Sequence, residues 1–235
     1  MQTIAEFGKI EYVKNDRCNR ISVRILVDSL RVTIPKHTTQ QQVLKFIQAH
    51  HEKILSKQEK IRKRERENPT ILNDNTHLHT LTFDVVFSKT NRNDIFFSMK
   101  NGLLTIEFPE SMDFTTEISQ KYCWNGINYF MRKEARRLFP DRTSQLAAKY
   151  GFAYSTVKIQ SSKSRWGSCS REKSINLSFY LMLLPAHLID YVILHELCHT
   201  KEMNHGDKFW SLMDKVTDRK SNVLRKELKK YHMPQ

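Results

Sequence analysis

Residues 195–205 are HELCHTKEMNH, and the rest of the chain is best interpreted outward from this stretch. It places His195, His199, His205 and Glu196 within eleven consecutive positions. An α-helix turns by about 100° per residue, so His195 and His199 project from nearly the same side, one turn apart. Two imidazoles placed in this way can each bring a nitrogen to about 2 Å from one zinc ion. The stretch therefore predicts a helix that carries two ligands of a single metal ion.

Glu196 and His205 complete the predicted site. Glu196 lies one step round the helix from His195, where its carboxylate can reach a metal-bound water, as the general base of an H-E-x-x-H hydrolase does. A catalytic zinc usually takes three protein ligands, and His205 is the natural third. In an unbroken helix His205 would lie about 15 Å along the axis from His195, too far to share an ion. We therefore expect a turn at Met203–Asn204, because Asn tolerates left-handed geometry and can cap the next helix.

An H-E-x-x-H pattern can also arise by chance in a chain with ten histidines. The surroundings favour a metal site. The apolar segment IDYVIL at 189–194 would bury one face of the helix, and neither Pro nor Gly interrupts the motif. Without a metal, this much buried imidazole beside a carboxylate would leave polar groups unpaired, which costs free energy.

The first 110 residues contain most of the predicted strands. Period-two patterns rich in β-branched residues predict strands at 10–13, 20–27, 30–35, 78–88, 94–99 and 103–109, with hairpin turns at Asp28-Ser29 and Asn101-Gly102. Between them, helical spacing and a charged end predict one long helix over 39–67.

The second half is predicted to be mainly helical. Helices are expected at 114–138, 141–150, 186–202, 206–216 and 220–231, and strands at 155–160 and 173–181. Pro185 precedes the first turn of the metal helix, where Pro is tolerated. Together the pattern predicts an α+β fold, in which a β-rich N-terminal part (residues 1–110) packs on a C-terminal part (residues 111–235) that holds the chemistry.

Composition restricts the class of protein. Lys and Arg outnumber Asp and Glu by 39 to 25, which gives a formal charge of +14. This balance is compatible with acidic partners such as nucleic acid, nucleotides or anionic protein surfaces, but also with ordinary solvated charged faces. The chain shows no secretory signal pattern and no uninterrupted apolar run long enough for a membrane span. Four cysteines without a CxxC pair fit reduced thiols, so we expect a cytoplasmic protein.

Four stretches of the chain resemble a known family. They are SRWGSCS (164–170), SINLSFYLMLLP (174–185), IDYVILHELCH (189–199) and NHGDKFW (204–210). Together they resemble the YgjP-like predicted metal-dependent hydrolases, which are related to the SprT and WLM metallopeptidases of the zincin group. The match covers about residues 164–216. The resemblance implies a zincin-like (minigluzincin) catalytic core in which His195, His199 and His205 bind one Zn2+ ion, or another divalent metal, and Glu196 activates water.

The leading hypothesis is a zinc-dependent hydrolase, and more narrowly a metallopeptidase that acts on protein or peptide. Its candidate substrate-binding residues are Arg165, Trp166, Gly167 and Ser168. Lying between two predicted strands, they could form an edge that pairs with an extended peptide, with Gly167 allowing close approach. Alternatively they form a tight turn in which Trp166 fills the core and Arg165 pairs with a carboxylate.

A second hypothesis is a metal-dependent nucleotide hydrolase that cleaves a phosphoanhydride. Basic side chains could hold the phosphates, namely Lys163, Arg165 and Arg171. The chain has no Gly-rich phosphate loop to support it.

A third hypothesis is a zinc-stabilised nucleic-acid-binding module. Its basic surfaces would be 57–66 and 219–230, which are equally compatible with solvated helix faces. A structural zinc needs a fourth protein ligand, which Glu202 or Asp207 could supply.

Four residues near the motif are expected to be structural. Phe209 and Trp210 lie at helical spacing with Leu212 and Met213, which favours the core. Cys169 and Cys198 are expected to be small buried thiols, and Cys198 points away from the ligand face of the helix.

Overall fold

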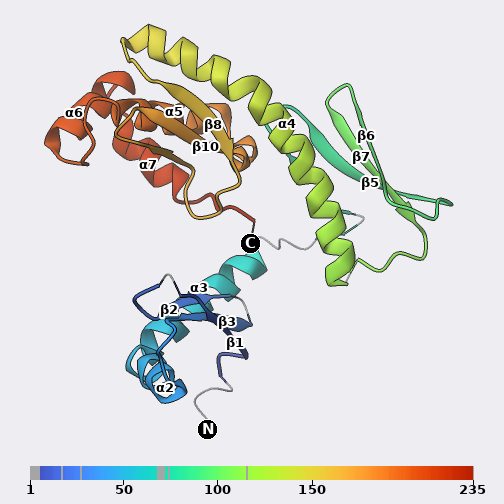
Figure 1. The fold of residues 1–235 in the computed structure, drawn as a ribbon. Coiled ribbons are helices and arrows are strands. Elements are labelled where there is room, and N and C mark those ends of the chain that lie inside the picture. The colour runs from blue at the N-terminus through green and yellow to red at the C-terminus, as the bar shows by residue number, and fades with distance from the viewer. Residues whose placement is uncertain are drawn as a thin grey trace. The chain divides into compact units, whose positions relative to one another are not determined.

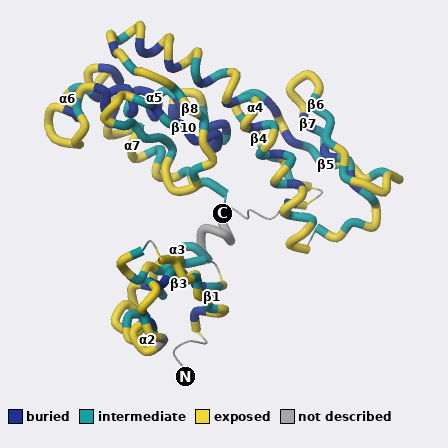
Figure 2. The backbone as a smooth tube through the Cα atoms, in the orientation of Figure 1, coloured by how far each residue is buried: buried dark blue, intermediate teal, exposed yellow. Residues whose placement is uncertain are grey.

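The structure is a computed structural model that describes residues 6–16, 18–26, 28–67, 72–73, 75–114 and 116–234, without the side chains of 40 and 63–67. The chain divides into two compact units, Met1–Thr70 (unit 1) and Ile71–Gln235 (unit 2). Each unit has its own hydrophobic core, and both units contain buried positions, dark blue in Figure 2. This division precedes the strands at 78–109, whereas the sequence pattern suggested a boundary at residue 110.

Unit 1 is a small sheet with two helices. Its strands are β1 (Lys9–Lys14), β2 (Ser22–Ile25) and β3 (Ser29–Ile34), in the order β1-β3-β2, with β1 parallel and β2 antiparallel to β3. The predicted single helix over 39–67 is wrong: the chain forms α2 (Gln40–Ala49) and α3 (His51–Glu67). The chain bends at His50, whose ring nitrogen Nδ1 bonds the Phe46 carbonyl at 2.9 Å. The bend lets both helices bury apolar side chains in the same core, Ile47 on α2 and Ile54 on α3.

A four-stranded sheet opens unit 2. Its strands are β4 (Leu78–His79), β5 (Asp84–Thr90), β6 (Phe96–Lys100) and β7 (Leu103–Pro109), in the order β4-β5-β7-β6. The predicted strand over 78–88 is therefore two strands. The hydroxyl of Thr80 donates to the Phe83 carbonyl and accepts from the Phe83 N–H, which closes the turn between them. The predicted turn at Asn101-Gly102 is confirmed, with φ angles of 49° and 75°.

Helix α4 (Glu117–Tyr150) is one continuous helix of 34 residues, so the two helices predicted at 114–138 and 141–150 are wrong. Pro140 lies inside it and cannot donate to the Arg136 carbonyl, which normally ends or kinks a helix. Packing explains why the helix continues, because Ala135 and Phe139 before Pro140 and Thr143 after it are buried on one stripe. The sheet β4–β7 shares a core with α4, and the Gln120 amide of α4 donates to the Leu72 carbonyl in the segment before β4.

The C-terminal half of unit 2 carries the motif. A three-stranded sheet has the order β8-β10-β9, with β8 (Thr156–Gln160) parallel and β9 (Gly167–Cys169) antiparallel to β10 (Ser174–Ser178). A 3-10 helix, η1 (Phe179–Leu183), follows β10, so the strand predicted over 173–181 ends early. The remaining helices are α5 (Ala186–Cys198), α6 (Asp207–Val216) and α7 (Ser221–Leu228).

Helix α5 is the most buried of these helices, since nine of its side chains are buried (Figure 2). Helix α4 runs beside the three-stranded sheet (Figure 1). The predicted α+β class is confirmed by this mixture of helices and sheets. Within the described residues, no helix has the length and apolar character needed to cross a bilayer.

Candidate metal centre

The helix that carries His195 and His199 ends earlier than the sequence predicted. Helix α5 ends at Cys198 rather than at 202, and His199 is its C-cap. The Cys198 carbonyl accepts hydrogen bonds from the N–H groups of both Lys201 and Glu202, at 3.0 and 2.9 Å, so the chain turns tightly there. Asn204 does not adopt the left-handed conformation that we expected, and Gly206 rather than Asn204 is the N-cap of α6. A loop over 199–206 replaces the predicted turn at Met203–Asn204.

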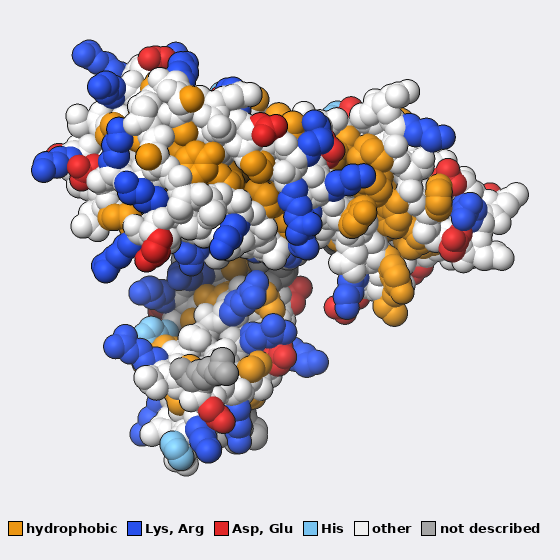
Figure 3. All heavy atoms as spheres, turned by 45° about the horizontal axis from the view of Figure 1, so that its top comes forward, with side chains coloured by type: hydrophobic (Ala, Val, Ile, Leu, Met, Phe, Trp, Pro, Cys, Tyr) orange, Lys and Arg blue, Asp and Glu red, His pale blue; other side chains and the backbone are white. Residues whose placement is uncertain are grey.

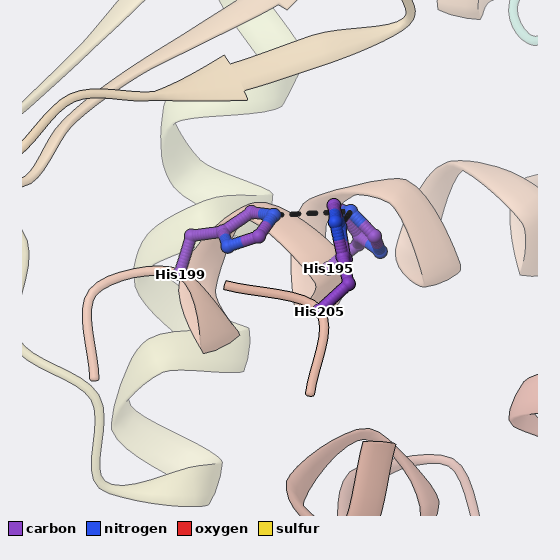
Figure 4. A group of neighbouring side chains, drawn as sticks. All are labelled: His195, His199 and His205. Carbon is purple, nitrogen blue, oxygen red and sulfur yellow. Dashed lines mark hydrogen bonds between the residues drawn. The ribbon is translucent and has the colours of Figure 1, made fainter. Parts of the chain in front are cut away.

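This loop brings the three histidines together (Figure 4). The Nε2 atom of His195 lies 3.2 Å from Nε2 of His199 and 3.0 Å from Nε2 of His205. One ligand atom from each ring lies within 4.8 Å of the others. His199 is buried, His195 is half-buried and His205 is exposed, so the group opens to solvent on the His205 side. The predicted convergence of the three rings is thus present in the structure.

Neighbouring groups fix the rings. The Nδ1–H of His199 donates to the backbone carbonyl of Glu202 at 3.0 Å, which leaves its Nε2 lone pair facing the other two rings. The Phe209 ring lies behind all three histidines, with centroid distances of 4.9, 4.6 and 4.7 Å to His195, His199 and His205. Phe209 is fully buried, which confirms its predicted place in the core.

Trp210 contacts the third histidine directly. Its indole Nε1–H donates to the His205 carbonyl at 3.1 Å, and its ring stacks on the His205 ring at 5.9 Å. Trp210 is half-buried, and its role in holding His205 was not predicted. The available signal was the position of Phe209 and Trp210 in the first turn of the helix that follows His205, because the histidine itself lies on the loop before this helix.

Burial controls the protonation of the centre. Burial lowers the pKa of His195 to about 3, and the charges of His199, His205 and Arg225 act in the same direction. Burial also lowers the pKa of His199. Neutral imidazole is the form that binds a metal ion, so the fold holds these two rings ready for one.

Glu196 lies buried beside the histidines, at 5 % exposed. Burial raises the pKa of its carboxyl to about 8, while the positive charge of Arg165 acts in the opposite direction. Among the described residues its Oε2 atom has no hydrogen-bond partner. A buried polar atom without a partner is costly, and a water held on a metal ion would supply the missing donor. The residues present therefore fit a metal ion with its water.

Gly167 on β9 packs directly against this carboxyl group. A Cβ atom built on Gly167 would lie 2.7 Å from Oε1 and 2.8 Å from Cγ of Glu196. Any side chain at this position would therefore displace the glutamate. Gly167 was predicted to allow close approach of a peptide, and the structure shows a close approach of Glu196.

The other candidate substrate residues lie at the edge of the three-stranded sheet. Trp166 and Ser168 are half-buried and Arg165 is exposed. Both alternatives for this segment keep some support. Trp166 packs against the core, as a tight turn would have it. Two observations favour the open edge instead. Among the described residues β9 pairs with β10 alone, and no carboxylate there forms an ion pair with Arg165.

The pairing of β9 defines which backbone groups face outward. Ser178 donates to the Trp166 carbonyl, Ser168 lies opposite Asn176, and Ser170 donates to the Ser174 carbonyl. In an antiparallel pair the bonded residues alternate along the strand. The N–H and C=O groups of Gly167 and Cys169 therefore point to the open edge.

The fourth ligand of a structural zinc is missing from this group. Across the ranges that the structure covers, the cluster holds the three histidines alone, and neither Glu202 nor Asp207 joins it. The two acidic residues instead line a shallow hollow with Lys201 and Lys208. Three ligands and an open side are the pattern of a catalytic rather than a structural zinc site.

Three histidines beside a buried glutamate are the arrangement of a metal-dependent hydrolase. A family model described as YgjP-like, metallopeptidase domain, matches residues 19–231, and the chain belongs to this family. Membership of a metallopeptidase family implies a catalytic metal and action on peptide bonds. The search of curated proteins gives no match.

Two solved structures are similar to part of the chain. One is the metallopeptidase zymogen jannalysin of Methanocaldococcus jannaschii, with 26% identity, 38% of this chain and 93% of that chain covered, and a TM-score of 0.33. The other is the metallopeptidase zymogen abylysin of Pyrococcus abyssi, with 21% identity, 37% and 91% covered, and a TM-score of 0.31.

Proposed function

We propose that this protein is a zinc-dependent peptidase in which His195, His199 and His205 hold the ion and Glu196 is the general base. The observation that carries the proposal is the convergence of three ring nitrogens beside a buried carboxylate oxygen without a partner. Three imidazoles with one position left for water form a ligand set typical of catalytic zinc.

The chain's own residues supply the rest of the chemistry. A bound zinc ion contributes Lewis acidity and lowers the pKa of a water toward 7. Oε2 of Glu196 accepts the proton of the attacking water and later gives it to the leaving amine. Burial raises the proton affinity of the Glu196 carboxyl, and the positive charge of a bound ion would act in the opposite direction and favour the carboxylate form that accepts a proton.

The open edge of β9 is the proposed place for the substrate. An extended peptide can pair with the outward N–H and C=O groups of Gly167 and Cys169, as in other strand additions. Since Gly167 touches Glu196, this pairing would bring a peptide bond next to the base. Arg165, Trp166 and Ser168 flank the same edge and are proposed to contact the substrate there.

Replacement of Glu196 tests the mechanism. Glu196→Gln keeps the shape of the side chain and all three histidines, so we expect bound zinc to stay at the level of the unmodified protein. Loss of the base should lower peptide hydrolysis by about 10²–10⁴-fold. Both quantities are measured on one preparation, zinc by elemental analysis and hydrolysis with an unstructured protein substrate.

The matched control is Glu202→Gln, because Glu202 touches His199 only through its backbone carbonyl. This variant should keep both zinc and activity. A Glu196→Gln protein as active as its parent would contradict the mechanism. Chelator-sensitive hydrolysis of nucleoside triphosphates without hydrolysis of protein would instead support the nucleotide hydrolase.

A further inference from the structure

A basic hollow lies at the β8 edge of the three-stranded sheet, on the side away from the open edge of β9. It measures about 390 Å³, within the size range of small-ligand sites. Helix α4 lines one wall, and the end of β8 with the following loop lines the other. The lining residues are Arg132, Arg136, Ile159, Gln160, Ser161 and Ser162.

The charge of this hollow is entirely positive. Arg132 and Arg136 lie one turn apart on α4, and the lining contains neither Asp nor Glu. In the described part of the chain, no ion pair engages either guanidinium. The Arg132 guanidinium lies 4.9 Å from the centre of the Phe179 ring, which holds it in place while its N–H edges stay open. Lys and Arg side chains are spread over the face of unit 2 drawn in Figure 3, with fewer acidic ones among them.

One residue ties the hollow to the proposed substrate edge. The Ser178 hydroxyl donates to the Ser162 carbonyl at 2.7 Å, and the Ser178 N–H donates to the Trp166 carbonyl at 2.9 Å. The loop between them, 162–166, therefore begins at the hollow and ends at β9. A peptide paired with the edge of β9 would have to follow this loop round the end of the sheet to reach the hollow.

The chemistry of the hollow matches a phosphoryl group. Two guanidinium groups can each bind phosphate oxygens bidentately, and serine hydroxyl groups can donate to the remaining oxygen. A single strand of nucleic acid would also need exposed aromatic rings on which bases stack. Phe179 and Tyr180, the rings beneath Arg132 and Lys163, are only 1 % and 2 % exposed, whereas Tyr129, three residues before Arg132 on α4, is 64 % exposed. One exposed ring is not a platform for successive bases, and the loop 162–166 links the hollow to the peptide edge, so a phosphorylated peptide is the favoured occupant.

We propose that this hollow binds the phosphoryl group of a phosphorylated serine or threonine in the peptide substrate, in the part of the substrate that leaves β9 along the loop 162–166. The substrate role rests on the proposed peptidase function. The protein would thereby select phosphorylated segments over unmodified ones, with β9 holding the backbone and the hollow holding the phosphate.

Binding is measured on the Glu196→Gln protein, so that no hydrolysis is required. Fluorescent peptides carry serine, glutamate or phosphoserine at one position, and their dissociation constants are compared by anisotropy. We expect the phosphoserine peptide to bind at least tenfold tighter than the serine peptide, because charge-assisted hydrogen bonds to phosphate are strong. Arg136→Ala should remove this advantage. Arg132→Ala is a second variant, and Lys133→Ala is the control, since it removes an exposed charge from a neighbouring position on α4.

Equal binding of the serine and phosphoserine peptides would overturn the proposal. An equal loss of affinity for the phosphoserine peptide in Lys133→Ala and Arg136→Ala would overturn it too. The affinity would then depend on the overall positive charge of α4 and not on the hollow. An oligonucleotide that competes more strongly than the phosphopeptide, and through Arg136, would assign the hollow to nucleic acid instead. A phosphopeptide bound through Arg136 but never cleaved by the unmodified protein would support the phosphate site and refute the peptidase function.

Discussion

At the scale of single residues, Gly167 is the position where adding one methyl group should change the rate of peptide hydrolysis most. Its φ angle is not in the left-handed region, so Gly167→Ala adds no backbone strain, but the new Cβ would overlap the Glu196 carboxyl group. We expect Gly167→Ala to keep zinc and to lose peptide hydrolysis by about tenfold or more, because a small displacement of a base is costly. Zinc content and hydrolysis rate are the measurements.

Gly206→Ala is the matched control for this change. Gly206 has φ of −81°, and an added Cβ there would meet nothing within 4 Å. Its activity should stay close to that of the unmodified protein. If both alanine variants lose activity equally, the contact between Gly167 and Glu196 is not what matters.

Glu196 also predicts a pH dependence of stability in the metal-free protein. Burial raises the pKa of its carboxyl from 4.5 to about 8 in the folded state. Between these two pH values the folded protein keeps a proton on Glu196 that the unfolded chain has lost. The free energy of unfolding therefore falls as pH rises through this range, and the fall ends above about pH 8. We expect the unmodified protein to lose stability relative to Glu196→Gln from pH 5 to 8, by up to about 1.4 kcal/mol per pH unit. Urea unfolding of both proteins in chelator checks this, and parallel curves would contradict it.

At the scale of elements, α7 supports the third histidine through α6. Arg225 on α7 lies 4.7 Å from the centre of the Trp210 ring, and Trp210 both stacks on His205 and bonds its carbonyl. His205 lies on a loop, so its position depends on this support more than the positions of His195 and His199 do. The stack links two helices, α6 and α7, to the third histidine.

Removing the Arg225 guanidinium should therefore weaken metal binding. We expect Arg225→Ala to lower zinc affinity about tenfold, in the range found for groups that orient metal ligands, and Arg225→Lys to restore part of it. Affinity is measured by competition with a chromophoric chelator. Lys226→Ala, next to it on α7, serves as the control and should bind zinc normally. An unchanged affinity in Arg225→Ala would show that the stack does not position His205.

At the scale of the whole molecule, the two units have separate cores. The core of unit 1 contains Leu30, Val32 and Ile47, whereas the core of unit 2 surrounds α5. All three histidines lie in unit 2, so zinc should stabilise that unit alone. At a free concentration of 100 times its Kd, the ion should add about 2.7 kcal/mol to the unfolding free energy of unit 2.

Calorimetry of the full chain and of residues 71–235, each with and without zinc, checks this expectation. We expect the zinc-dependent transition to be present in both proteins and to shift by the same amount. A single transition of the full chain that shifts as a whole would show that the two units unfold together.

Much of the fold could be predicted from local sequence, and the errors share one cause. The turn at Asn101-Gly102 and the helix end at residue 150 were correct, because each depends on residues that tolerate positive φ, Asn101 and Gly102 in the turn and Gly151 after the helix. The errors at His50, Pro140 and the end of α5 concern where helices break or continue. Those choices depend on which side chains a core can bury, and a local pattern does not contain that information.

The sequence by itself determined that two candidate metal ligands share one helix face. The spacing of His195 and His199 places both imidazoles there, because the helical period follows from backbone geometry alone. Only the tertiary structure decided that His205 reaches the same point, that Glu196 is buried against Gly167, and that two arginines of α4 face the loop before β9. Those arrangements depend on packing between segments far apart in the chain, whose free energies no single segment encodes.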